Sequence, residues 1–238
     1  AEKMKSAVKV FVTMCLLLGL ISILSFVSFA APSMDFFYEG NSLSESGEFE
    51  EAIQSYNKAI ELDSDVPEFY FNKALALSKL GKYNEAIGLY ERAIFQDSDY
   101  KEAYFNKGLC LMEVHKLDYA LDTINEYIDR YPKESDGYIL KGDIFLDMKR
   151  YDEAVDISDK LISMRGRDNG KLSLAYSNKG CALAYLGRIG EALTASNKAL
   201  ELDNTNTKAY IAMSFAYNYQ RKYEEAIDAL TEIAELAN

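Results

Sequence analysis

The chain has 238 residues, of which 49% are hydrophobic and 27% are charged, a composition typical of a folded protein and not of a disordered one. Its 38 acidic residues outnumber its 26 basic residues, which gives a net charge of −12. A surface this acidic repels nucleic acid phosphates and attracts basic peptides or basic protein surfaces. The alternative is that the acidic excess only keeps the protein soluble. The composition therefore excludes nucleic acid as the expected partner.

The amino-terminal segment contains three lysines, Lys3, Lys5 and Lys9, followed by an uncharged run from Val10 to Ala31. At a rise of about 1.5 Å per residue, a helix over this run is long enough to cross a hydrocarbon core of roughly 30 Å. The run also lacks the polar face that a surface helix of a folded domain shows. We therefore predict one hydrophobic amino-terminal helix that meets a membrane.

Two interpretations of residues 1–31 stay open. The small residues around Ala30 are typical of a signal peptide that is cleaved after that residue. The apolar run is longer than the ~7 to 15 residues of an ordinary signal core, which favours an uncleaved transmembrane signal anchor. In both cases the positive charges before the run predict that the remaining chain is extracytoplasmic, either secreted or membrane-anchored.

The rest of the chain repeats one pattern six times, mostly at a spacing of 34 residues. An aromatic residue stands at the fourth position of each unit, and an alanine follows 16 residues later, as in Phe36 with Ala52 and Tyr70 with Ala86. Apolar residues at i, i+3, i+4 and i+7 form two stretches in each unit, which predicts a pair of helices joined by a short turn. We expect one elongated repeat domain over residues 33–238, with units at 33–66, 67–100, 101–134, 135–168, 173–206 and 207–238.

Small residues recur where the two helices of each unit should meet, and glycine recurs in the turn between them. Gly40, Gly108 and Gly180 are examples of the first set, and they predict close helix packing. Gly47 and Gly81 are examples of the second set, where a left-handed residue ends a helix at low cost.

The pattern resembles the tetratricopeptide repeat. The resemblance is clearest over residues 69–74 (Phe-Tyr-Phe-Asn-Lys-Ala) and 81–87 (Gly-Lys-Tyr-Asn-Glu-Ala-Ile), which are followed by Tyr90 and Ala93. It implies an all-α fold, a right-handed superhelical solenoid of six helix-turn-helix repeats, here preceded by the hydrophobic amino-terminal helix. It also implies a non-enzymatic scaffold that binds a protein or peptide.

In this resemblance, the second, fifth, ninth, twelfth and thirteenth residues of each repeat line a concave groove on the first helices. That projection predicts these partner-binding residues: Phe37, Asn41, Phe71, Leu75, Phe105, Leu109, Met112, Ile139 and Asp143. Further carboxylates surround them, at Glu68, Glu102, Asp136 and Asp147. We expect a partner segment with apolar anchors and basic neighbours. The alternative is that packing between repeats buries the phenylalanines and leaves the groove without a ligand.

No constellation of catalytic or metal-binding residues is apparent in the sequence. His115 is the single histidine and takes the place of a turn glycine, so we interpret it as a helix-end residue and not as a catalytic base. Cys110 and Cys181 lie two repeats apart and are interpreted as packing residues. The acidic pairs around Ser64 and Ser98 lack the other residues of a calcium loop and are assigned to turns. We predict no enzyme activity, no metal site and no cofactor.

Two further segments depart from the regular pattern. Four inserted residues, Asn169 to Leu172, lie in a basic, glycine-rich stretch that we interpret as a lengthened surface loop, with a hinge or contact loop as the alternative. The last helix carries Ile227, Leu230 and Ile233 without a following polar helix to cover them. This open edge could meet another copy, a partner or further chain.

These observations predict an exported or membrane-tethered scaffold that binds a partner in its first-helix groove. The alternative is an assembly subunit of a membrane or envelope complex that forms a homo-oligomer through its carboxy-terminal edge. A regulatory arm for a catalytic partner on another chain also stays open, because a repeat fold alone does not fix a function.

Overall fold

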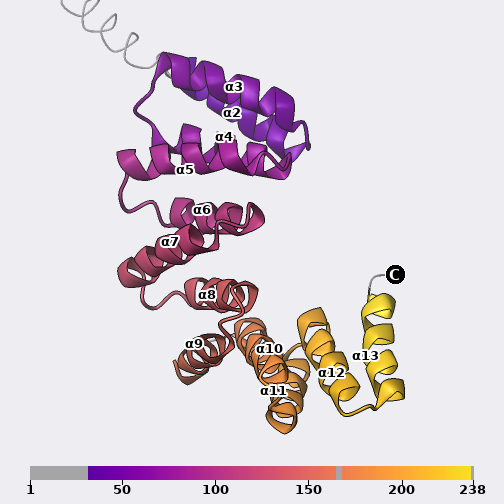
Figure 1. Cartoon of the computed structure of the whole chain (residues 1–238). Coiled ribbons are helices and arrows are strands. Elements are labelled where there is room, and N and C mark those ends of the chain that lie inside the picture. Colours follow the sequence, from indigo (N-terminus) through magenta and orange to yellow (C-terminus); the bar gives the residue numbers. More distant parts are fainter. Residues whose placement is uncertain (1–31, 165–167, 237–238) are drawn as a thin grey trace, which may run out of the picture. The chain divides into compact units, whose positions relative to one another are not determined.

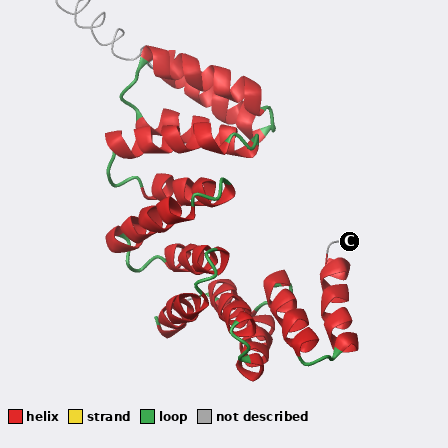
Figure 2. Ribbon diagram, in the orientation of Figure 1, coloured by secondary structure: helices red, strands yellow, loops and turns green. Residues whose placement is uncertain are grey.

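The computed structural model describes residues 32–164 and 168–236, and these residues form twelve helices, two for each of the six repeats, without a strand (Figures 1 and 2). The predicted all-α architecture of helix pairs is thus confirmed. The helices are α2 (Pro32–Glu45), α3 (Phe49–Leu62), α4 (Pro67–Lys79), α5 (Tyr83–Gln96), α6 (Lys101–Glu113), α7 (Leu117–Arg130), α8 (Ser135–Asp147), α9 (Tyr151–Ser163), α10 (Asn169–Tyr185), α11 (Ile189–Leu202), α12 (Thr207–Tyr219) and α13 (Tyr223–Leu236).

The predicted hydrophobic helix and the signal peptide or anchor lie in residues 1–31, outside the described residues. Among the helices that the structure describes, none combines the length and the apolar composition needed to span a membrane.

The chain divides into two compact units at the boundary between Lys82 and Tyr83, inside the second repeat. The described part of the first unit contains α2, α3 and α4. Its core holds two phenylalanines, a tyrosine and three alanines: Phe37, Phe69, Tyr56, Ala52, Ala59 and Ala76. The second unit contains α5 to α13, in which each helix contacts the next along the chain. The first helices α8, α10 and α12 also contact one another in succession.

Glycines let the two helices of a pair approach each other closely, as the sequence predicts. A Cβ added to Gly40 would lie 2.6 Å from Tyr56 Cε1, and a Cβ added to Gly108 would lie 2.7 Å from Ile124 Cδ1. These distances are shorter than any normal carbon contact. A larger residue at either position would therefore force the helices apart.

Each first helix ends in the same turn. In α6, the His115 amide donates to the Met112 carbonyl at 2.8 Å, and the Lys116 amide donates to the Leu111 carbonyl at 2.9 Å. This is the Schellman pattern, which places the residue after the helix in the left-handed region. Three of these positions are glycines, at φ of 72° to 82°, and the other three are His115, Lys149 and Arg221, at φ of 56° to 61°.

The predicted loop at Asn169–Leu172 is wrong, because these four residues form the first turn of α10. The Asp168 side chain accepts a hydrogen bond from the Lys171 amide at 2.8 Å and so caps this helix. The helix has 17 residues, whereas the other first helices have 13 or 14. The insertion lengthens a helix by about one turn.

Candidate partner-binding site

The nine predicted contact residues are divided between the two units. Phe37 is only 9% exposed, and its ring lies 5.0 Å from that of Phe69 and 6.1 Å from that of Tyr56. The core of the first unit therefore buries this ring, as the alternative interpretation of the phenylalanines expected. Phe37 is a packing residue and is unavailable to a partner in this conformation.

The other predicted residues of the first unit are Asn41, Phe71 and Leu75, and all three are half-buried. The Asn41 side-chain oxygen accepts hydrogen bonds from the Tyr56 hydroxyl at 2.8 Å and from the Asn72 amide at 3.2 Å. Its polar group thus joins α2 to α3 and α4. Phe71 and Leu75 keep part of their apolar surface exposed.

In the second unit, the predicted residues lie on α6 and α8. Leu109 is 38% exposed, whereas Phe105, Met112 and Ile139 are half-buried. The Phe105 ring lies 5.9 Å from that of Tyr127, so one side of it packs inside the unit. These four side chains present partial apolar surface on the first helices.

Asp143 takes part in an internal network that joins three first helices. The Lys208 ammonium of α12 lies 2.5 Å from Asp143 Oδ1 of α8 and 2.8 Å from Asn178 Oδ1 of α10. The Asn178 amide donates in turn to the Ile139 carbonyl at 3.2 Å. Asp143 is therefore already neutralised by a residue of its own chain.

A cavity of about 610 Å³ opens beside this network, lined by residues from α8, α9, α10 and α12. Asp147 lies at its wall and forms no hydrogen bond or ion pair within the described residues. Partial burial, reinforced by the negative charge of Asp143, raises the pKa of the Asp147 carboxyl above its usual value.

Sequence reasoning did not assign the aromatic wall of this cavity. Tyr185 stacks on Tyr151 with ring centroids 4.8 Å apart and planes at 8°, and it meets Phe215 at 4.8 Å. Asp147 and Tyr185 are both the thirteenth residue of their repeats, and Lys208 is the second residue of its own. The sequence analysis named Asp147, and the groove projection, carried through every repeat, would also have found Tyr185 and Lys208.

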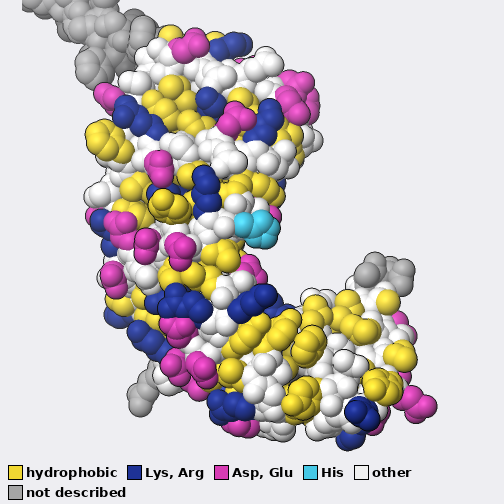
Figure 3. All heavy atoms as spheres, viewed as in Figure 1, with side chains coloured by type: hydrophobic (Ala, Val, Ile, Leu, Met, Phe, Trp, Pro, Cys, Tyr) yellow, Lys and Arg dark blue, Asp and Glu magenta, His cyan; other side chains and the backbone are white. Residues whose placement is uncertain are grey.

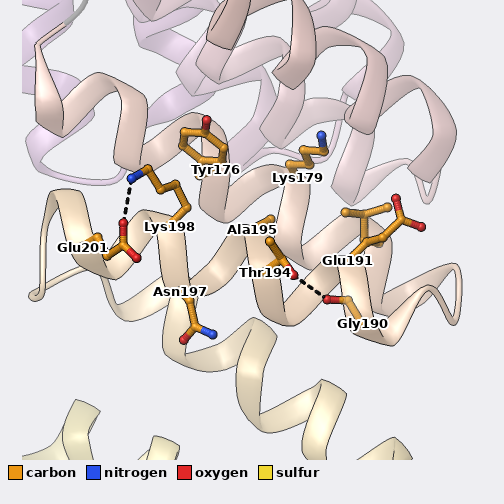
Figure 4. A pocket seen from close by; sticks show the side chains of 10 residues that line it. Tyr176, Lys179, Gly190, Glu191, Thr194, Ala195, Asn197, Lys198 and Glu201 are labelled. Carbon is orange, nitrogen blue, oxygen red and sulfur yellow. Dashed lines mark hydrogen bonds and ion pairs between the residues drawn. The ribbon is translucent and has the colours of Figure 1, made fainter.

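A second cavity, of about 660 Å³, lies on the α10–α11 pair (Figure 4). Its charged side chains are already paired with other residues of the chain. Lys198 bonds Glu201 at 2.6 Å, Lys179 bonds Asp159 at 2.6 Å, and Glu191 bonds Arg188 at 2.7 Å. This surface offers a ligand little uncompensated charge.

The carboxy-terminal helix pair carries an apolar surface. Figure 3 shows hydrophobic side chains gathered over this end of the second unit. Tyr223, Ile227 and Leu230 are 58%, 62% and 51% exposed, and together with Phe215 they line an opening of about 350 Å³ between α12 and α13. Apolar side chains of the predicted edge are therefore exposed among the described residues.

The cysteines and aspartates considered for catalysis or metal binding are buried or lie in turns. Cys110 and Cys181 are both buried, and burial raises the pKa of Cys181 to about 11. Asp63 and Asp97 each accept the amide hydrogen of the residue two positions later, which confirms turn chemistry. Within the residues that the structure describes, no group of histidine, cysteine or acidic side chains is arranged to hold a metal ion.

Comparison with known families agrees with this architecture. A model described as TPR repeat matches residues 40–81, and models described as tetratricopeptide repeat match residues 73–135, 135–168 and 174–206. These segments together span most of the chain. The chain belongs to the tetratricopeptide repeat family. It is thus a protein-interaction scaffold of a non-enzymatic family.

Two curated relatives match short segments. Sperm-associated antigen 1 of Mus musculus is 38% identical over 64 residues, which are 27% of this chain and 7% of that protein. Tetratricopeptide repeat protein 36 of Caenorhabditis elegans is 42% identical over 67 residues, which are 28% of this chain and 37% of that protein. The matches thus span well under half of either relative.

Solved tetratricopeptide repeat structures share the fold. A repeat protein from Parabacteroides merdae superposes with a TM-score of 0.70 at 18% identity, covering 89% of this chain and 82% of that one. The MamA protein gives 0.65 at 24% identity, covering 74% and 94%. YrrB gives 0.55 at 22% identity, covering 76% and 91%.

Proposed function

We propose that this scaffold binds an extended peptide segment of a partner protein across the first helices of its second unit. The observation that carries the proposal is the set of exposed apolar side chains on α6, α10 and α12: Leu109, Tyr185, Ile211 and Phe215, at 38%, 52%, 49% and 44% exposure. Exposed apolar surface beside carboxylates suits a segment with hydrophobic anchors and basic neighbours. One protein of similar fold, YrrB, is described as a tetratricopeptide repeat protein with an unusual peptide-binding site.

The test is selection of peptides from a displayed random library against the full chain, followed by affinity measurement on variants. We expect Leu109→Glu and Ile211→Glu each to weaken the selected peptides about tenfold or more, because each places a charge in the apolar contact. Tyr119→Glu is the matched control, since Tyr119 is 67% exposed on the second helix α7. Equal affinity for all three variants, or failure to select any peptide, would overturn the proposal.

We propose also that residues 1–31 direct the scaffold out of the cytoplasm, as a cleaved signal or as a membrane anchor. The support is the three lysines before the uncharged run from Val10 to Ala31. Expression of the full chain followed by fractionation and amino-terminal sequencing tests this. A mature chain that begins after Ala30, or an intact chain in the membrane fraction, agrees with export, whereas an intact chain in the cytoplasmic fraction contradicts it.

A second candidate function is assembly through the apolar surface of α12 and α13. The exposure of Tyr223, Ile227 and Leu230 favours it, because contiguous apolar surface of this kind is typical of interaction sites. Analytical ultracentrifugation of the full chain over a range of concentrations separates the two functions. A mass that rises with concentration and is reduced by Ile227→Lys supports assembly, whereas a constant monomer mass excludes it.

A further inference from the structure

The α8–α10–α12 cavity combines one unpaired carboxylate with an aromatic wall. Four charged side chains line it: Asp143, Asp147, Lys149 and Lys208. Lys208 and Asp143 form an ion pair at 2.5 Å, so these two charges neutralise each other. Lys149 is exposed in the turn after α8 and forms no ion pair with Asp147. Asp147 is therefore left without a counter-ion in this part of the described chain.

The charges around Asp147 leave it poorly compensated. Those that act on it most strongly belong to Asp143 and Glu113, which are negative, and to Lys208 and His115. Lys208 is already engaged by Asp143 and Asn178. A second cation placed beside Asp147 would restore the balance of charge.

The aromatic side chains supply the apolar part of the cavity. Tyr151 and Tyr185 line it, and Phe215 continues the row towards the carboxy-terminal end of the unit. Tyr185 is 52% exposed although it packs against a ring on each side. A lysine or arginine side chain has the matching chemistry, with an apolar stem that packs on rings and a charged head that pairs with a carboxylate.

The volume of the cavity is sufficient for such a side chain. About 610 Å³ falls within the roughly 300–1,000 Å³ typical of small-ligand pockets, so a lysine or arginine side chain can enter with solvent to spare. The cavity also lies on the first helices, beside the residues assigned to peptide contact. A side chain of a peptide bound there could reach it without a change in the helices.

We propose that this cavity is a receptor for one basic side chain of the bound peptide, with Asp147 pairing with its cation and Tyr151 and Tyr185 packing on its stem. The proposal rests on the proposed peptide-binding function. Asp143 and Lys208 hold the three helices in register and do not contact the ligand cation directly. The net charge of −12 on the chain favours the approach of a basic segment.

Two small probes of the same shape test the receptor directly. Butylguanidinium carries the charge, and butylurea is its neutral counterpart. We titrate each into the isotopically labelled full chain and follow the NMR signals of Asp147 and Tyr185. The expected result is saturable binding of butylguanidinium that is about tenfold tighter than that of butylurea, a difference of ~1.4 kcal/mol.

Variants locate the site. Asp147→Asn should abolish the preference for the charged probe, and Tyr185→Leu should weaken both probes. Asp122→Asn, an exposed carboxylate on α7 without a hydrogen bond or ion pair among the described residues, is the matched charge control and should bind as the wild type does. Equal binding of the two probes, or an equal effect of Asp147→Asn and Asp122→Asn, would overturn the proposal.

Measurements with selected peptides distinguish failure of the proposed receptor from failure of the proposed peptide-binding function. Replacing each basic residue of a selected peptide by norleucine should weaken binding to the wild type about tenfold at one position and leave binding to Asp147→Asn unchanged there. Peptides that bind across α6 and α12 but tolerate every such replacement contradict the receptor alone. Failure to select any peptide contradicts the proposed function.

Discussion

Two buried serines show that the contribution of a hydroxyl to stability depends on its hydrogen-bond partners. Ser173 and Ser196 are both 0% exposed. The Ser173 hydroxyl donates to the Ala199 carbonyl at 2.9 Å and accepts from the Asn206 amide at 2.7 Å. The Ser196 hydroxyl has no hydrogen-bond partner. Burying a polar atom without a partner costs free energy, whereas a bonded one is stabilising.

The two serines therefore respond differently to the same substitution. We expect Ser173→Ala to lower the free energy of unfolding by about 1–2 kcal/mol, because it removes two buried hydrogen bonds, those to the Ala199 carbonyl and from the Asn206 amide. Ser196→Ala should leave stability unchanged or raise it. Urea unfolding followed by circular dichroism measures both, and an equal loss in the two variants would contradict the assignment.

Asp147 should show opposite effects on stability and on binding. Its folded-state pKa is raised, so the folded chain takes up this proton more readily than the unfolded chain. The ionised carboxylate is therefore destabilising above that pKa, and the cost shrinks as the pH falls below it and is gone below the unfolded-state pKa. Asp147→Asn should raise stability at pH 7 by less than about 1 kcal/mol, because Asp147 is exposed and solvent screens its charge, while it weakens cation binding.

The measurement is thermal unfolding at pH 7 and again at a pH below the folded-state pKa. The gain from Asp147→Asn should shrink at the lower pH, because the wild-type carboxyl is then protonated. A gain that is independent of pH would show that the charge of Asp147 is not its cause.

At the scale of the helix, the left-handed turn residue after each first helix favours glycine over residues with a side chain. Arg221 has a φ of 61°, in the region where a side chain is strained, whereas Gly187 has a φ of 75° at the equivalent position. We expect Arg221→Gly to raise the free energy of unfolding by about 0.5–1 kcal/mol and Gly187→Ala to lower it by about 1 kcal/mol. Thermal unfolding measures both changes as shifts of the melting temperature. The same sign for both substitutions would contradict this account.

The helices could be predicted from the sequence because every pair repeats one apolar period and one turn. The helical structure of the insertion could not be predicted, because its Asn and Gly residues are typical of a loop. The Asp168 side chain caps a helix there, and Asn169–Leu172 form its first turn. Burial of Phe37 depends on the rings of Tyr56 and Phe69, which the repeat position alone does not reveal. The Lys208–Asp143 pair joins residues 65 positions apart, beyond any local pattern.

At the scale of the whole molecule, the acidic excess of −12 predicts a salt-sensitive encounter with basic peptides. Raising the salt concentration from about 50 mM to about 500 mM should slow association by roughly tenfold and change dissociation much less, because screening acts mainly on the approach. Stopped-flow fluorescence measures both rates. Salt-independent association would show that the net charge has no part in binding.

The central claim is that the first helices of the second unit, and not its outer or carboxy-terminal surfaces, hold the partner. Methyl NMR of the full chain with and without a saturating selected peptide tests it most directly. The account predicts shifts at Leu109, Ile139 and Ile211 on α6, α8 and α12, with little change at Ile227 and Leu230 on α13. Shifts confined to Ile227 and Leu230 would contradict it and would place the partner on the carboxy-terminal surface.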